Sequence, residues 1–231
     1  MNNSLRFNFF DYFLIFGVIG LSILAAILDH HMDWLDFIGV VTGIINLVLC
    51  AKGNIYNYVF GIIYNAIYAY IAFSTSLYAD AAIYAAYYLP MQFIGWYNWK
   101  KNRDQEDGTV NVKHLSFRSA LILLAAAAVL VPLLAWVLSL PVVGDAQPWT
   151  DSATTAASIL GMYMMVKAIA EQWYIWLVLD VLLVVKWTIE VANETPHAAM
   201  WLIMFAFYAA NSAYGLIQWN RLARKKASGQ L

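Results

Sequence analysis

The sequence predicts an all-α membrane protein with eight transmembrane helices, and three observations carry this prediction. Hydrophobic residues make up 63% of the 231 residues and charged residues only 12%, whereas soluble domains carry about 25% charged residues. The apolar residues gather in runs close to the ~20 residues that a helix needs to cross a bilayer. The basic residues fall between these runs in a one-sided pattern. A sheet is disfavoured because the runs are too long and do not alternate strictly.

The apolar runs give the order of the helices. We expect spans at 9–28, 35–51, 55–73, 79–98, 117–139, 152–168, 173–191 and 198–219. The first run is longer than the apolar region of a usual signal peptide, and only Arg6 precedes it, so we expect a retained helix.

The distribution of Lys and Arg predicts the orientation. With the N-terminus in the cytoplasm, 12 of the 13 Lys and Arg residues fall on the cytoplasmic side, and the other one, Lys186, lies inside a span. The opposite loops contain no Lys or Arg; they are 29–33, 74–76, 141–151 and 193–197. The positive-inside rule therefore places both termini in the cytoplasm.

Two segments of the chain resemble each other. Gly95 and Trp99 match Gly215 and Trp219 at an offset of 120, and 52–58 matches 170–176 at an offset of 118. Three spans reverse the side of the membrane and a linker span restores it, so the two repeats are expected to be parallel. The alternative is that aromatic and basic anchors at helix ends produce the match by themselves.

This repeat divides the chain into five parts. They are an extra N-terminal helix (1–33), a first three-helix repeat (34–101), a linker with a central helix (102–149), a second repeat (150–221) and a basic cytoplasmic tail (222–231).

Several spans carry a polar and aromatic face. Residues at i, i+3 and i+7 share one face of a helix, and in the seventh span these are Trp173, Trp176 and Asp180. The other polar faces contain Asn46; Asn57, Gly61, Tyr64 and Tyr68; Tyr84, Tyr88, Gln92 and Gly95; and Tyr208, Asn211, Ser212 and Gly215. A polar group facing hydrocarbon costs several kcal/mol, so we expect the faces to converge on an internal site.

Other residues have structural interpretations. Trp34, Trp99, Trp149 and Trp219 lie near span ends, where indoles anchor helices at the membrane interface. Gly61 and Gly215 are expected at close helix contacts, and Pro90 is expected to kink its helix. Lys186 either snorkels outward or pairs with Glu190.

The remaining chemistry excludes several function classes. Cys50 is the one cysteine and lies in an apolar run, and the four histidines lack the spacing of a metal site. A net charge of −1 gives no reason to expect nucleic acid. No nucleophile–base pair or phosphate loop is present, so we expect no enzyme activity, no metal and no cofactor.

Four motifs carry a family resemblance. They are NYVFG (57–61) with Tyr64, LYAD (77–80), QFIGWYNW (92–99), and EQWYIW (171–176) followed by Asp180. Over about 34–221 the sequence resembles the PnuC family of bacterial nicotinamide riboside transporters. The resemblance implies a 3+1+3 core related to the SWEET sugar transporters. It also implies uptake of nicotinamide riboside, a precursor of NAD, by facilitated diffusion across the inner membrane, with a cytoplasmic riboside kinase trapping the product.

The resemblance and the polar faces together give the candidate substrate contacts. They are Gln92, Trp96, Trp176, Asp180 and Asn211, then Trp173, Asn46, Asn57 and Tyr64, with Tyr88 and Tyr208 on the same faces. Aromatic rings stack on a cationic pyridinium, while amides and Asp180 bond ribose hydroxyls. Position 172 is Gln where relatives often carry Asn, and Asp180 stands where some carry Asn, so thiamine-like and other nucleoside ligands stay open.

Two rival functions and the oligomeric state also stay open. A sugar transporter of the same fold would use Asn and Trp but has less need for a carboxylate. A retinal photoreceptor would use Lys186, yet Asp180 lies six residues away, where a counterion is expected one turn away. The sequence does not decide whether the protein forms a homo-oligomer.

Overall fold

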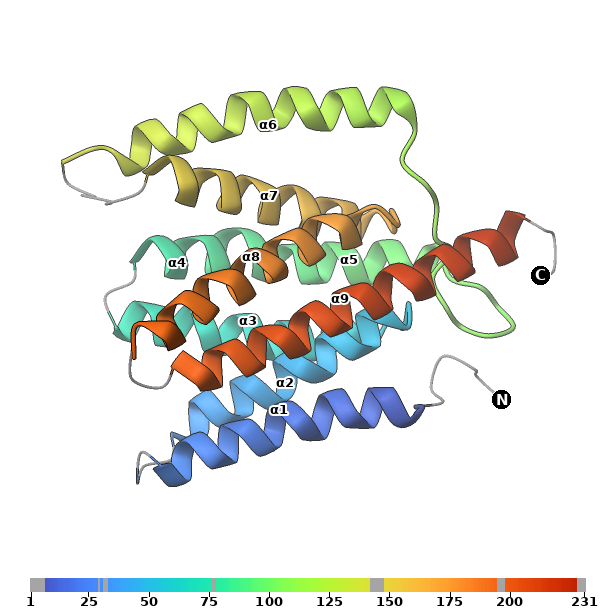
Figure 1. Cartoon of the computed structure of the whole chain (residues 1–231). Coiled ribbons are helices and arrows are strands. Elements are labelled where there is room, and N and C mark those ends of the chain that lie inside the picture. The colour runs from blue at the N-terminus through green and yellow to red at the C-terminus, as the bar shows by residue number, and fades with distance from the viewer. Residues whose placement is uncertain are drawn as a thin grey trace.

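The computed structural model describes residues 7–28, 30, 33–75, 78–141, 148–194 and 198–227, and within these ranges the fold is all-helical (Figure 1). Its elements are α1 (Phe9–Leu28), α2 (Trp34–Ala51), α3 (Asn57–Ser74), α4 (Tyr78–Ile83), the π-helix η2 (Tyr84–Tyr88), α5 (Leu89–Lys101), α6 (Phe117–Leu138), α7 (Pro148–Val166), α8 (Gln172–Ala192) and α9 (Ala198–Ala227). Because α4, η2 and α5 follow one another directly, each of the eight expected runs corresponds to one helical rod.

Four of these rods are long and apolar enough by themselves to cross a membrane: α1, α2, α6 and the 199–224 part of α9. The others include α3 and α8, which carry polar faces. The helix α9 continues to Ala227, beyond residue 219 where the membrane span is expected to end, so the first part of the expected basic tail is helical. Residues 220–227 contain no Gly or Pro and are rich in Arg, Lys, Leu and Ala, which favour helix.

The fourth rod is irregular one turn before Pro90. The amide of Leu89 donates to the carbonyl of Tyr84, five residues back, so the chain makes a π turn there. A proline has no N–H to donate, and its ring clashes with the carbonyl four residues earlier. The extra residue in the π turn accommodates this clash. The expected disturbance by Pro90 is therefore present as a π-helix over Tyr84–Tyr88.

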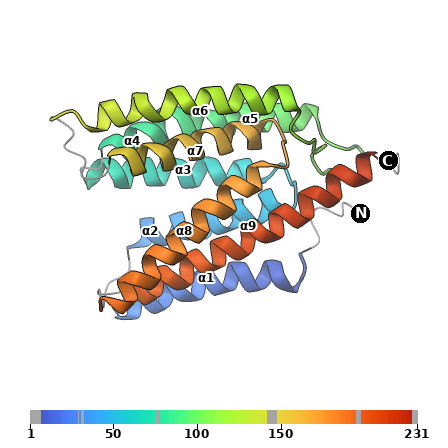
Figure 2. The same cartoon turned by 45° about the horizontal axis from the view of Figure 1, so that its top comes forward.

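The helices run alongside one another, with α6 at one edge of the bundle and α1 at the other (Figure 1). Turning the molecule shows α3 to α7 in one layer and α1, α2, α8 and α9 in the other (Figure 2). The last helix of each expected repeat packs on the first helix of the other: α5 packs on α7, and α9 packs on α2. We refer to 34–101 and 150–221 as the first and second halves. The start of α1, the end of α9 and the 102–116 segment lie at the same end of the bundle, which we call the terminal end.

Two turns at the terminal end have the same backbone hydrogen bonds. After α2, the amide of Asn54 donates to Leu49 at 2.9 Å, and after α7, the amide of Ile169 donates to Met164 at 2.9 Å. The residue before each donor has positive φ: 65° at Gly53 and 54° at Ala168. The turns thus match at an offset of 115, which corrects the 118 inferred from the sequence.

The 102–116 segment, which we call the strap, joins these two turns. The amide of Val110 donates to Gly53 at 2.9 Å, while Lys113 exchanges backbone hydrogen bonds with Ala168 and Ala170 at 3.0 Å each. Val110 is buried, as is Val112 between the two pairings. The strap therefore fixes one turn relative to the other.

A buried ion pair holds α1 against the first of these turns. Asp11 is 0% exposed, and Lys52, directly after α2, donates to its Oδ2 at 2.8 Å. The Asn8 amide donates to the same carboxylate at 2.7 Å, and the Asn8 side chain donates to Tyr214 of α9 at 2.9 Å. The extra helix is thus bonded to both halves. Sequence reasoning did not identify this pair, because its partners lie 41 residues apart.

We expect Lys52→Met to lower the free energy of unfolding by about 3–5 kcal/mol, because it leaves the Asp11 carboxylate buried without its cation. Lys167 has the same place in the second turn but is exposed, so Lys167→Met is the matched control and should change stability by less than about 0.5 kcal/mol. Unfolding in detergent measures both. Equal effects of the two substitutions would show that the ion pair contributes nothing.

Candidate functional site

Amide side chains from two helices, α2 and α5, meet over Gly61 of α3. Asn46 of α2 donates through Nδ2 to the Asn57 carbonyl at 2.7 Å. A Cβ on Gly61 would lie 2.3 Å from Gln92 Oε1 and 2.8 Å from Asn46 Nδ2. The close contact expected at Gly61 is therefore confirmed, and only glycine leaves room for the two amides.

A second polar group lies on α8 and α9. Ser212 donates to Asp180 Oδ2 at 2.6 Å, and Trp176 Nε1 donates to Gln172 Oε1 at 3.3 Å. Trp173 is 2% exposed, and its ring lies over Gly215, where a Cβ would come within 2.6 Å. The expected contact at Gly215 is confirmed, and the burial of Trp173 shows that its indole faces the interior.

Several buried polar atoms on these faces have no hydrogen-bond partner. Buried polar groups are nearly always paired, and an unpaired one costs about 1–3 kcal/mol. In the described part of the chain, six such atoms belong to α3, α5, α8 and α9; they are Asn57 Oδ1, Tyr58 OH, Gln92 Oε1, Gln172 Nε2, Trp173 Nε1 and Asn211 Oδ1. We call these the six unpaired atoms. They have hydrogen-bonding capacity that the described protein groups leave unused.

Two of these six residues, Tyr58 and Gln172, are absent from the sequence-based set. The offset of 115 pairs Asn57 with Gln172 and Tyr58 with Trp173, so a correct alignment of the turns would have found them. Tyr58 mirrors Trp173 in its packing, because its ring lies over Gly95 as the indole lies over Gly215.

The predicted tyrosines and Trp96 are half-buried. Tyr64 and Tyr88 belong to a cluster around Tyr84, whose ring centroid lies 6.3 Å from Tyr64 and 4.9 Å from Tyr88. Trp96 packs with Trp176 against the core cluster that contains Tyr58 and Trp173. Tyr208 packs against a second core cluster on α1 and α2, formed by Leu14, Val18, Ile44 and Val48.

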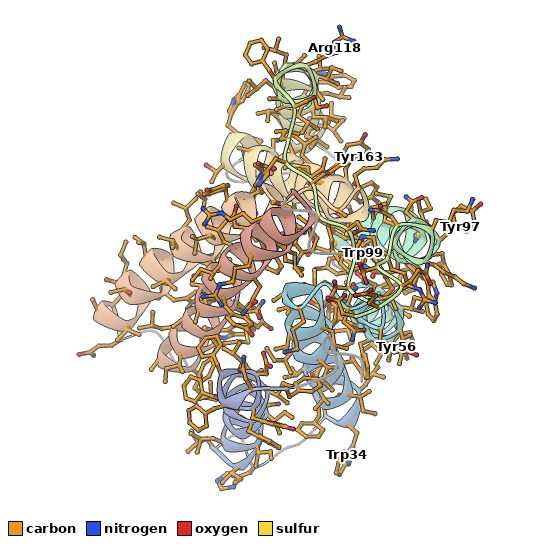
Figure 3. The ribbon with its side chains drawn as sticks, turned by 90° about the vertical axis from the view of Figure 1, so that its right-hand side faces the viewer. Trp34, Tyr56, Tyr97, Trp99, Arg118 and Tyr163 are labelled. Atoms are coloured by element: carbon orange, nitrogen blue, oxygen red, sulfur yellow. The ribbon has the colours of Figure 1, made fainter. Side chains whose placement is uncertain are left out.

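Two of the expected membrane anchors are instead core residues. Trp99 and Trp219 are both 0% exposed, and Figure 3 shows Trp99 near the middle of the bundle while Tyr97 points outward. The anchor prediction was wrong for these two because their place near a span end in the sequence concealed the crossed packing of α5 and α9. Trp34 and Trp149, 68% and 65% exposed, fit the anchor interpretation.

Lys186 takes no part in the site. It is exposed on α8, and its Nζ lies 5.6 Å from the centroid of the neighbouring Trp187 ring. Within the described ranges, no three His, Cys, Asp or Glu residues gather as metal ligands.

Residues 33–221 match the family described as nicotinamide mononucleotide transporter. The chain belongs to this family. It is 33% identical over 216 residues to the nicotinamide riboside transporter PnuC of Neisseria mucosa, covering 91% of this chain and 81% of that one. It is also 25% identical to the riboflavin/roseoflavin transporter RibM of Streptomyces davaonensis, covering 84% and 88%.

A solved structure has the same fold. The crystal structure of the vitamin B3 transporter PnuC superimposes with a TM-score of 0.76 at 28% identity, covering 95% of this chain and 94% of that chain. The relatives are transporters by name, and together with the apolar helices they make this chain a multi-pass membrane protein of a transporter family. The resemblance to PnuC drawn from the sequence motifs is confirmed.

Proposed function

We propose that this protein carries nicotinamide riboside across the bacterial inner membrane. The observation that carries the proposal is the set of six unpaired atoms on faces that also hold Trp96, Trp173 and Trp176. Amides suit the hydroxyls of a neutral ribose, and indoles suit a flat pyridinium ring. The relatives named as nicotinamide riboside transporters give independent support.

Charge favours the riboside over its phosphorylated form. Phosphate groups are bound by Arg and Lys, yet the basic side chains of the described helices lie toward the terminal end, apart from the exposed Lys186. Asp180 would repel a phosphate and attract a cation. The alternative substrates are a flavin and a hexose, and both are neutral at their rings. The same carboxylate therefore favours the cationic ring of nicotinamide riboside over either of them.

Each group in the site has a proposed role. Asn46, Asn57, Gln92 and Asn211 bond the ribose and carboxamide of the ligand. Trp96, Trp173, Trp176, Tyr64, Tyr88 and Tyr208 supply ring surfaces; a cation over such a ring gains about 0.5–2 kcal/mol. Asp180, held by Ser212 at 2.6 Å, offers its carboxylate to the pyridinium.

The proposed mechanism is rocking of two parallel three-helix repeats in an eight-span protein of the SWEET type. The matched turns at Gly53 and Ala168 and the crossed packing of α5 and α9 favour such a repeat. The start of α1 and the end of α9 lie at the basic end of the bundle, which favours a cytoplasmic position for both termini (Figure 1). Transport is facilitated diffusion, and a cytoplasmic riboside kinase traps the product.

Calorimetric titration of the purified protein tests the substrate. Nicotinamide riboside should bind selectively over nicotinamide, nicotinamide mononucleotide, thiamine, riboflavin and a hexose. Trp176→Ala should weaken that binding by about 0.5–2 kcal/mol, because the cation loses one ring. Binding of riboflavin or the hexose with no response to the riboside would refute the assignment while leaving the family intact.

Gly61→Ala tests where the ligand binds. The new Cβ would displace Gln92 Oε1 from 2.3 Å, and because that atom ends a flexible side chain, the fold should persist while the amide moves. We expect riboside affinity to fall about tenfold or more through the lost hydrogen bond. Gly20→Ala is the matched control, since nothing lies within 4 Å of its added Cβ. Unchanged affinity in Gly61→Ala would place the ligand elsewhere.

A further inference from the structure

Two tryptophans, one in each half of the protein, each donate a hydrogen bond to a backbone carbonyl in the other half. Trp99, near the end of α5 in the first half, donates through Nε1 to the Met165 carbonyl in the second half at 3.0 Å. Trp219, in α9 of the second half, donates to the Cys50 carbonyl in the first half at 2.9 Å. Each indole therefore bonds the end of the other half's first helix, next to the turn held by the strap.

The position of this pair follows from the repeat. Trp99 and Trp219 match at an offset of 120, and their ring centroids lie 5.6 Å apart. Two residues related by a twofold axis and in contact with each other must lie on either side of that axis. A substrate path between parallel repeats runs along the same axis. The two indoles therefore stand across the path.

The packing around the pair leaves no opening at this level. Tyr58 meets Trp99 edge-on at 5.0 Å, and Trp173 meets Trp219 edge-on at 5.9 Å. Trp99, Trp219 and Tyr58 are 0% exposed and Trp173 is 2% exposed. A planar pyridinium ring cannot pass between aromatic rings already in contact.

Tyr58 and Trp173 also connect this barrier to the site. Each carries one of the six unpaired atoms, Tyr58 OH and Trp173 Nε1, while its ring touches one indole of the pair. A ligand that bonds these atoms can move both rings, and with them the pair that closes the path.

We propose that Trp99 and Trp219 form the gate at the terminal end of the transport path, closed in this structure. The gate rests on the proposed transport function and on the repeat. Opening requires both indoles to release the carbonyls of the opposite half. The chain's single cysteine, Cys50, supplies one of those carbonyls and is 3% exposed. Its thiol thus reports whether the gate is open.

The test is the rate at which a membrane-impermeant maleimide labels Cys50 in inside-out vesicles without ligand. Trp99→Phe and Trp219→Phe keep a ring but remove the N–H, so labelling should be about five- to tenfold faster than in the wild type. Gly17→Ala is the control for general loosening, because its Cβ would collide with Phe207 at 2.3 Å in the α1–α9 contact. It should leave labelling unchanged.

Faster labelling in both tryptophan variants and not in Gly17→Ala supports the gate. Unchanged labelling in the tryptophan variants, or equal acceleration in Gly17→Ala, overturns it. A further experiment measures Cys50 labelling of the wild type with nicotinamide riboside added. If the tryptophan variants respond while the riboside has no effect, the gate stands and the substrate assignment fails.

Discussion

Polar groups inside an apolar bundle must find partners within the protein, and this constraint shapes most of the structure. Water cannot satisfy them in the bilayer core. The carbonyls at the ends of α2 and α7 are met by indole N–H groups of the opposite half. The Asp11 carboxylate takes Lys52 as its partner, and Asp180 takes Ser212. The two indole bonds join helices that are distant in the sequence, and the two carboxylate bonds join successive helices, so satisfying the polar groups assembles the bundle.

The buried polar atoms that have no partner indicate where a ligand binds. The six unpaired atoms gather on the faces of α3, α5, α8 and α9, beside aromatic rings and glycines that let helices approach closely. In the described part of the chain the one further buried atom without a partner is Asp11 Oδ1, whose carboxylate already bonds Lys52 through its other oxygen. The six atoms therefore stand out as a group, and we infer that a hydroxylated ligand with a flat ring is their partner. The proposed gate extends the same logic, because two of the six residues touch the indoles that close the path.

The sequence predicted the helices well because hydrophobic runs are a local property, and every expected run corresponds to a helical rod. It also identified the family through short motifs. It failed where the outcome depends on contacts between distant segments. Trp99 and Trp219 looked like anchors because their burial arises from packing against the opposite half. Tyr58 and Gln172 were missed because an offset of 118 concealed their match to Trp173 and Asn57.

The most direct test of the account is an experimental structure of the protein with nicotinamide riboside bound. We expect the ligand between the two halves, with the amides of Asn57, Gln92 and Asn211 bonded to it and its ring against Trp173 or Trp176. A ligand bound elsewhere, with the six atoms still unpaired, would contradict the claim that they are kept open for substrate.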